Sequence, residues 1–234
     1  LIKKLLISAA SSAVLISTAA MATPGAYVGL NAGYGTMDVP DIGPSYKTLV
    51  DNLTPGVTGH YGRSDGGFSG GVDAGYLWGD EHLNYGAETG FTTYQGSSRY
   101  VDGTEDQKMG DMRYDFSGYN IDLLGVLKYN FSSQWDVFGK AGIAYVHQAF
   151  SAAISTENLS PEEQPLIPRS GDNAQSKLLP KVVFGGGYDF DNGFGVNLTM
   201  SHIFGHKGDM INNGAKQIAG DYSGVNQVAS VTTV

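Results

Sequence analysis

The feature that most constrains this chain is a strict two-residue alternation of apolar with small or polar side chains, repeated along most of its length. In residues 26–35, AYVGLNAGYG sets Ala26, Val28 and Leu30 on one face and Asn31 on the other. Successive side chains of a β-strand point to opposite sides, so this pattern predicts a strand with one apolar face. The alternation predicts eight strands, over residues 26–35, 68–78, 83–94, 119–131, 135–147, 181–190, 194–204 and 225–234.

Composition removes several classes of protein. The 234 residues contain 34 Gly and no Cys, with 23 Asp and Glu against 14 Lys and Arg, for a formal net charge of −9. The lack of cysteine excludes a disulfide framework, a thiolate metal site and a thiol nucleophile. The acidic balance argues against a nucleic-acid partner, which usually meets a basic patch. A hydrophobic content of 41% is enough to bury a core, so wholesale disorder is excluded.

The first 22 residues are expected to be a secretory signal peptide. Lys3 and Lys4 provide the positive start, an apolar stretch follows, and Ala20-Met21-Ala22 supplies a small-x-small cleavage pattern. The rest of the chain contains no uninterrupted apolar run of about 18 residues, so no transmembrane helix is expected there. Strands that expose one apolar face to lipid would leave no such run.

The connections between the expected strands differ in length at the two ends of the sheet. Short ones cover residues 79–82, 132–134 and 191–193, and Gly193 suits a turn that needs a positive φ. Long polar ones cover residues 36–67, 95–118, 148–180 and 205–224. This is the layout of outer-membrane barrels, whose short turns face the periplasm. Aromatic residues mark both strand ends, as interfacial girdles would: Trp78, Tyr129, Phe131, Trp135, Phe190 and Phe194 beside the short turns, and Tyr34, Phe68, Tyr119 and Phe204 beside the long connections.

With this layout, and with strings such as AYVGLNAGYG (26–35) and GGVDAGYLWG (70–79), the chain resembles the small eight-stranded outer-membrane barrels of the OmpA/OmpX and opacity-protein type. The resemblance spans residues 23–234. It implies an all-β, eight-stranded antiparallel up-and-down transmembrane β-barrel, monomeric, in the outer membrane of a Gram-negative bacterium. Its partners would be membrane lipid, lipopolysaccharide and the barrel-assembly machinery. Such barrels usually end on an aromatic residue, whereas this sequence ends in SVTTV (230–234), so the resemblance implies a truncated last strand.

The polar face of the strands predicts a charged lumen. The candidate network consists of three acids and three lysines on that face: Asp73, Glu88, Asp122, Lys128, Lys140 and Lys181. An eight-stranded barrel has an interior that side chains can just fill, so these charges are expected to neutralise one another and plug the barrel. The family resemblance also supports an alternative, in which exchange of salt-bridge partners gates a narrow pore for ions or small solutes.

A more specific hypothesis concerns the hairpin at residues 79–82. If it pairs Trp78 with Leu83, Asp73 faces Glu88 directly, and one carboxyl must then be protonated or a cation must intervene. Lys140 lies at a similar depth and is the candidate bridge. Asp122 and Lys181 would form an upper layer.

The functional prediction is an outer-membrane surface or structural protein, adhesin-like through acidic long loops that bind a host or environmental surface. A remote alternative is a soluble exported barrel that binds an apolar ligand, with the apolar face turned inward. No enzyme activity and no cofactor are expected. Ser201 and His202 are adjacent on a strand and point to opposite faces, so they form no nucleophile–base pair.

Overall fold

The computed structural model describes residues 24–37, 60–62, 66–104, 107–155, 170–205 and 231–233, and these segments are all-β. Their strands are β1 (Gly25–Met37), β2 (His60–Gly62), β3 (Gly66–Gly79), β4 (Leu83–Thr104), β5 (Gln107–Asn130), β6 (Trp135–Ser155), β7 (Ser170–Asp189), β8 (Gly195–Ile203) and β9 (Val231–Thr233). The expected signal peptide, residues 1–22, lies outside the described residues, as do residues 225–230 of the expected eighth strand. Among the described segments, no helix is long and apolar enough to cross a membrane.

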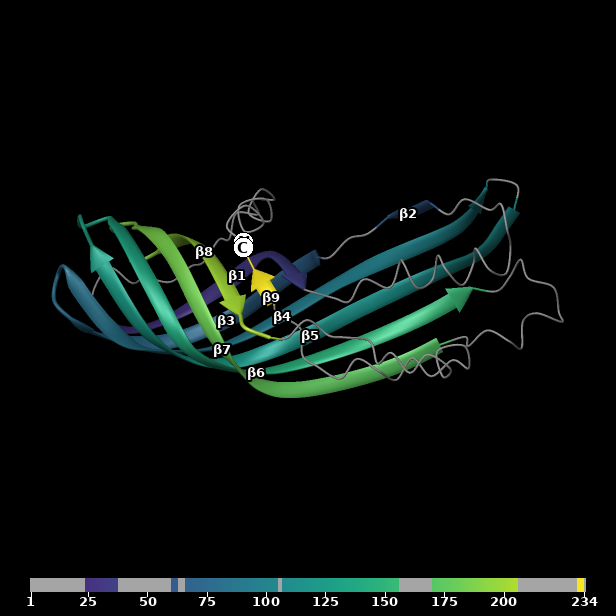
Figure 1. Cartoon of the computed structure of the whole chain (residues 1–234). Helices are drawn as coiled ribbons and strands as arrows, with labels where there is room; N and C mark the ends of the chain where they lie inside the picture. The colour runs from purple at the N-terminus through teal and green to yellow at the C-terminus, as the bar shows by residue number, and fades with distance from the viewer. Residues whose placement is uncertain are drawn as a thin grey trace.

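The strands form one antiparallel, up-and-down sheet that closes on itself (Figure 1). Its order is β4-β3-β1-β9-β8-β7-β6-β5, and β5 pairs with β4 to complete the ring. The seam between β1 and β8 is formed by β9, which pairs with residues 35–37 of β1 and residues 201–203 of β8. β2 adds a short pairing to residues 99–101 of β4. The eight-stranded antiparallel barrel predicted from the sequence is confirmed.

Four strands are longer than the alternation predicted. β4 and β5 stay paired from Leu83↔Tyr129 to Thr104↔Gln107, and β6 and β7 stay paired as far as Ala153↔Ser170. The predicted long loops over residues 95–118 and 148–180 were therefore largely wrong, because most of these residues continue the strands. The alternation is lost there since neither face of a sheet beyond the lipid has to be apolar, although backbone pairing continues to satisfy the N–H and C=O groups.

The apolar faces of the strands point outward. Val28 and Phe184 keep 70% and 65% of their surface exposed, whereas Lys128 and Asn84, on the opposite faces, are 0% exposed. This inverts the arrangement of a water-soluble barrel, so the soluble ligand-binding alternative was wrong: it required the apolar faces to line the interior. In water such a surface would be a very large apolar patch, while in a bilayer it is solvated by acyl chains. The protein is a transmembrane β-barrel.

Aromatic contacts mark both edges of this apolar surface. At the short-turn end, Trp78 lies 6.3 Å from Tyr85 and Trp135 lies 4.9 Å from Tyr188, between ring centroids. At the opposite end, the Phe91 and Tyr119 rings are 5.8 Å apart. On β5, about ten residues separate Tyr119 at this edge from Tyr129 at the short-turn edge, which corresponds to roughly 25 Å across the membrane for a strand tilted by about 40°. This height matches the hydrocarbon layer that outer-membrane barrels span.

Two of the three short turns are stabilised by their first polar side chain, and the third contains a glycine with a positive φ. The Asp80 carboxylate accepts hydrogen bonds from the backbone N–H groups of His82 (2.8 Å) and Leu83 (2.9 Å). Ser132 Oγ accepts one from the Trp135 N–H (2.9 Å). In the third turn, Gly193 has φ +84°, the left-handed conformation that the sequence predicted.

The first turn also corrects the predicted register. Gly79 pairs with Asn84 and Trp78 pairs with Tyr85, so the expected pairing of Trp78 with Leu83 was wrong. Because the Asp80 side chain closes the turn over the residues that follow it, the connection starts one residue later than expected. The slip changes the partner of each β3 residue by two positions, and because two is an even number every side chain keeps its predicted face.

Candidate functional site in the barrel lumen

The barrel encloses charged and amide side chains in three tiers at increasing distance from the short turns. Alternation along β3 to β8 points these groups inward, and the barrel wall buries nearly all of them. All six residues of the predicted network face the lumen, and five are buried: Glu88, Asp122, Lys128, Lys140 and Lys181. Asp73 is half-buried.

The first tier lies nearest the short turns and is centred on Lys128. Its ammonium is 3.0 Å from Asp189 Oδ2 and 3.1 Å from Asp136 Oδ2. Beside it, Asn130 Nδ2 donates hydrogen bonds to Asn84 Oδ1 (3.2 Å) and to the Glu81 carbonyl (3.0 Å), which ties the lumen to the first turn. This tier therefore contains two carboxyl groups and one ammonium.

The second tier pairs Lys140 with Glu88. Lys140 Nζ lies 2.5 Å from Glu88 Oε2, and the Tyr27 hydroxyl donates to the same oxygen at 2.7 Å. The ammonium also lies 5.1 Å from the centroid of the Phe138 ring, within cation–π range. An ion pair removed from water in this way is favourable only with such additional donors and packing.

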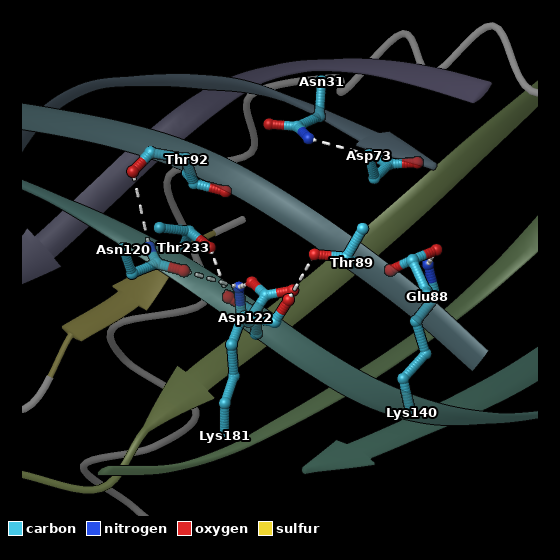
Figure 2. A network of polar contacts seen from close by, with 11 residues as sticks. Asn31, Asp73, Glu88, Thr89, Thr92, Asn120, Asp122, Lys140, Lys181 and Thr233 are labelled. Atoms are coloured by element: carbon cyan, nitrogen blue, oxygen red, sulfur yellow. Dashed lines mark hydrogen bonds and ion pairs between the residues drawn. The ribbon is translucent and has the colours of Figure 1, made fainter. Parts of the chain in front are cut away.

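The third tier pairs Lys181 with Asp122 (Figure 2). Lys181 Nζ lies 2.5 Å from Asp122 Oδ2 and donates to Asn120 Oδ1 at 3.1 Å. Thr89 Oγ1 donates to the backbone carbonyl of Asp122 at 2.9 Å. Figure 2 shows that this tier and the Lys140–Glu88 pair are separate groups on neighbouring strands.

Asp73 does not occupy the position that the sequence hypothesis gave it. It lies opposite Gly90, while Glu88 lies opposite Gly75, so the predicted direct opposition of the two carboxylates was wrong. The register set by the first turn separates them. Asp73 instead accepts a hydrogen bond from Asn31 Nδ2 at 3.1 Å. Lys140 therefore contacts Glu88 without having to bridge two facing acids.

A small polar cavity lies between the second and third tiers. Its volume is about 70 Å³, and its polar lining includes Asp73, Glu88, Asp122, Lys140, Lys181 and Asn197. It has room for about five water molecules. No group of three or more His, Cys, Asp or Glu side chains among the described residues is arranged to hold a metal ion.

An apolar cluster closes the lumen beyond the charged tiers, and the sequence analysis did not foresee it. It is formed by buried side chains from seven strands: Met37, Tyr94, Phe116, Ala144, Val146, Leu179, Ile203 and Val231. Ala144 and Ile203 pair with Asp122 and Lys181, and Phe116 and Leu179 lie further toward the long-strand end of their strands. To pass these side chains, an ion would have to lose its hydration water and would have no charged partner beside it, as at a hydrophobic constriction.

The Ser201 and His202 side chains point to opposite sides of β8. Ser201 Oγ lies 2.5 Å from Thr233 Oγ1 and lines the polar cavity, while the His202 ring packs edge-on against Phe204. Neighbouring strands do bring a different pair together, since His147 Nδ1 lies 2.7 Å from Ser176 Oγ. The pair is best described as a hydrogen bond at the membrane interface, beside the stacked Tyr119 ring.

No family model matches the chain, which is similar to a known protein sequence and to solved structures. An uncharacterized protein of Coxiella burnetii (strain RSA 493 / Nine Mile phase I) is 28% identical over 196 residues, which cover 77% of this chain and 75% of that protein. Among solved structures, Ail, the attachment invasion locus protein of Yersinia pestis, aligns over 90% of this chain and 95% of its own, with 12% identity and a TM-score of 0.39. That TM-score is too low to carry an argument, so the fold assignment rests on the strand pairing and the outward apolar surface.

Proposed function

We propose that the protein is an outer-membrane surface scaffold: a plugged barrel that holds extended strands outside the cell, where they bind a host or environmental surface. The observation that carries this proposal is the length of β4 to β7 beyond the membrane (Figure 1). The outer aromatic contact lies at Phe91 and Tyr119, yet β4 continues to Thr104 and β5 begins at Gln107. The hairpin therefore extends about 12 residues past the lipid, or roughly 40 Å along the strand.

The expected signal peptide and the fold support the outer membrane as the location. Single-chain bacterial membrane barrels have an even number of strands, with short turns on the periplasmic side and long segments on the outer side. This chain has that asymmetry, with short turns at residues 80–82, 131–134 and 190–194. On this proposal the long strands face outward, and the outer leaflet that they cross supplies lipopolysaccharide as the neighbouring lipid.

The filled lumen supports a scaffold over a pore. The three lysines in it are ion-paired, and the apolar cluster around Phe116 and Leu179 lies in series with the charged tiers. Opening a path would require breaking buried ion pairs and hydrating an apolar layer at the same time. A rigid barrel below extended strands is a general way to position a binding surface. The proposal includes no enzymatic activity.

The test compares the full chain with a variant whose outer β4–β5 hairpin is trimmed. Replacing residues 98–114 by Asn-Gly would join Ser97 to its register partner Asp115 through a turn suited to a hairpin. Both proteins are refolded into fluorescent liposomes and applied to fixed epithelial cells. We expect the full chain to bind and the trimmed chain to fall to the level of protein-free liposomes, with folding checked by heat-modifiable gel migration. Equal binding by the two folded proteins would refute a recognition role for this hairpin.

A planar bilayer measurement tests the plug separately. We expect no discrete conductance steps from inserted protein. Steps that change when Lys140 or Lys181 is neutralised would instead support a gated pore.

A further inference from the structure

The first lumenal tier has more acid than its lysine can neutralise. Asp136, Asp189 and Lys128 are all buried, with 3%, 4% and 0% of their surface exposed. Both carboxyl groups face the same ammonium, at 3.1 and 3.0 Å. If both were ionised, a buried group of three would carry a net negative charge. The second and third tiers, by contrast, each match one lysine with one acid.

Four oxygen atoms in this tier have no hydrogen-bond donor among the described residues. They are both oxygens of Asp136, Oδ1 of Asp189 and Oδ1 of Asn197, and all are buried. Lys128 donates a hydrogen bond to Asp189 Oδ2. Apart from the same ammonium, 3.1 Å from its Oδ2, Asp136 has no donor among the described residues, which is a costly environment for a buried ionised carboxyl group.

The position of Asn197 is a second, independent indication of an unmatched acceptor. Gly187 lies between Asn197 on β8 and Asp136 on β6 in the strand register. Since Gly187 has no side chain, the two neighbouring side chains meet above it: a Cβ placed there would contact Asn197 Oδ1 and lie 2.9 Å from Asp136 Oδ2. A carboxyl oxygen and an amide oxygen thus converge with no hydrogen between them.

We propose that this tier binds one proton at neutral pH, held on Asp136 and donated to Asn197 or Asp189. The proton supplies the missing donor, leaves Asp189 as the single counter-charge of Lys128, and makes the tier neutral. A metal ion fits less well, because the ammonium lies against both carboxyl groups and would repel it. The charged and polar groups that face Asp136 are Lys128 from β5, Asp189 from β7 and Asn197 from β8, and the next charged groups inward are Glu88 and Lys140.

Loss of this proton would place a second negative charge beside one ammonium in a buried site. The zero net charge of this tier stabilises the contact of β5, β6, β7 and β8 at the short-turn end. We therefore expect alkaline pH to destabilise this end of the barrel first. This inference does not depend on the proposed recognition function, since it concerns the opposite end of the barrel.

The direct test is carbon-13 NMR of the full chain, labelled at aspartate carboxyl carbons and refolded in detergent micelles. At pH 7 we expect one aspartate with the chemical shift of a neutral acid. That resonance should be absent from D136N and present in D191N, which makes the same change at an exposed turn residue. A wild-type spectrum in which every aspartate is ionised, or a neutral resonance that survives in D136N, would overturn the proposal.

A second measurement keeps the test decisive if D136N does not fold well. In the unsubstituted chain, the nitrogen-15 signal of the Asn197 side-chain amide should shift with the same midpoint as the neutral carboxyl, and independent midpoints would count against the proposal. Where D136N does fold, the unfolding equilibrium constant of the wild type relative to D136N should rise about tenfold per pH unit above about pH 4, because only the folded wild type retains the proton. A ratio that stays flat between pH 4 and pH 7 would also overturn it.

Discussion

Replacement of Lys140 by alanine should remove the only ammonium on Glu88 in the second tier and leave that carboxylate buried. The pair is well enclosed, with side-chain exposures of 8% and 5%. Lys140→Ala also deletes the packing of the lysine stem and its contact with the Phe138 ring. The Tyr27 hydroxyl remains as a donor to Glu88, so the carboxylate is not left wholly without a partner.

Two independent estimates give a similar magnitude. Unit charges about 4 Å apart attract by ~4 kcal/mol at an effective dielectric constant of about 20. Removing one partner of a buried pair typically costs about 3 to 5 kcal/mol. With Tyr27 still bonded, we expect K140A to lose about 3 kcal/mol in the free energy of unfolding at pH 7.

Unfolding by urea in lipid vesicles, followed by tryptophan fluorescence, gives the free energy of unfolding at pH 7. Lys177→Ala is the matched control, because Lys177 is exposed on β7. The double variant K140M/E88Q should recover part of the loss, since no buried charge remains.

The result that would refute this reasoning is a K140A protein as stable as K177A at pH 7. A K140M/E88Q protein that recovers none of the loss would show that packing, and not the orphaned carboxylate, dominates the effect.

Two further predictions concern a turn and a glycine. The backbone N–H groups of Leu83 and His82 hold the pKa of the exposed Asp80 carboxyl below its usual range. Any stability from this carboxylate is therefore present at neutral pH and is lost only as the pH falls through that lowered pKa. An NMR titration of Asp80 with a midpoint at the ordinary value would contradict this. Gly187→Ala should destabilise the barrel by about 1 to 3 kcal/mol, because the added methyl group would contact Asn197 and Asp136. Gly125→Ala is the control in the same urea assay, because a Cβ added at Gly125 would lie 3.7 Å from its nearest neighbour.

The amino-acid sequence by itself determined which face of each strand each residue occupies. Alternation has a period of two, so the inward positions of Lys128, Asp122 and Lys181 follow from local order alone. The aromatic girdles and the Gly193 turn follow from local chemistry as well, because an interfacial ring or a positive φ needs no distant partner. Even the slip in register left these assignments intact.

The tertiary structure decided which of those inward residues meet. A turn that starts one residue later moves Glu88 away from Asp73, and the closure of the ring brings Lys140 of β6 to Glu88 and Tyr27. Pairings of this kind depend on the relative shift of strands, which no local pattern encodes.

The same limit applies to the long strands, the apolar cluster and the convergence over Gly187. β4 to β7 continue past the lipid because their neighbours offer backbone partners, although the side-chain alternation has ended. Met37 and Val231 join Phe116 in one cluster only after the barrel closes. The sequence determined what faces the lumen through a local period, whereas contacts across it required the three-dimensional register of all eight strands.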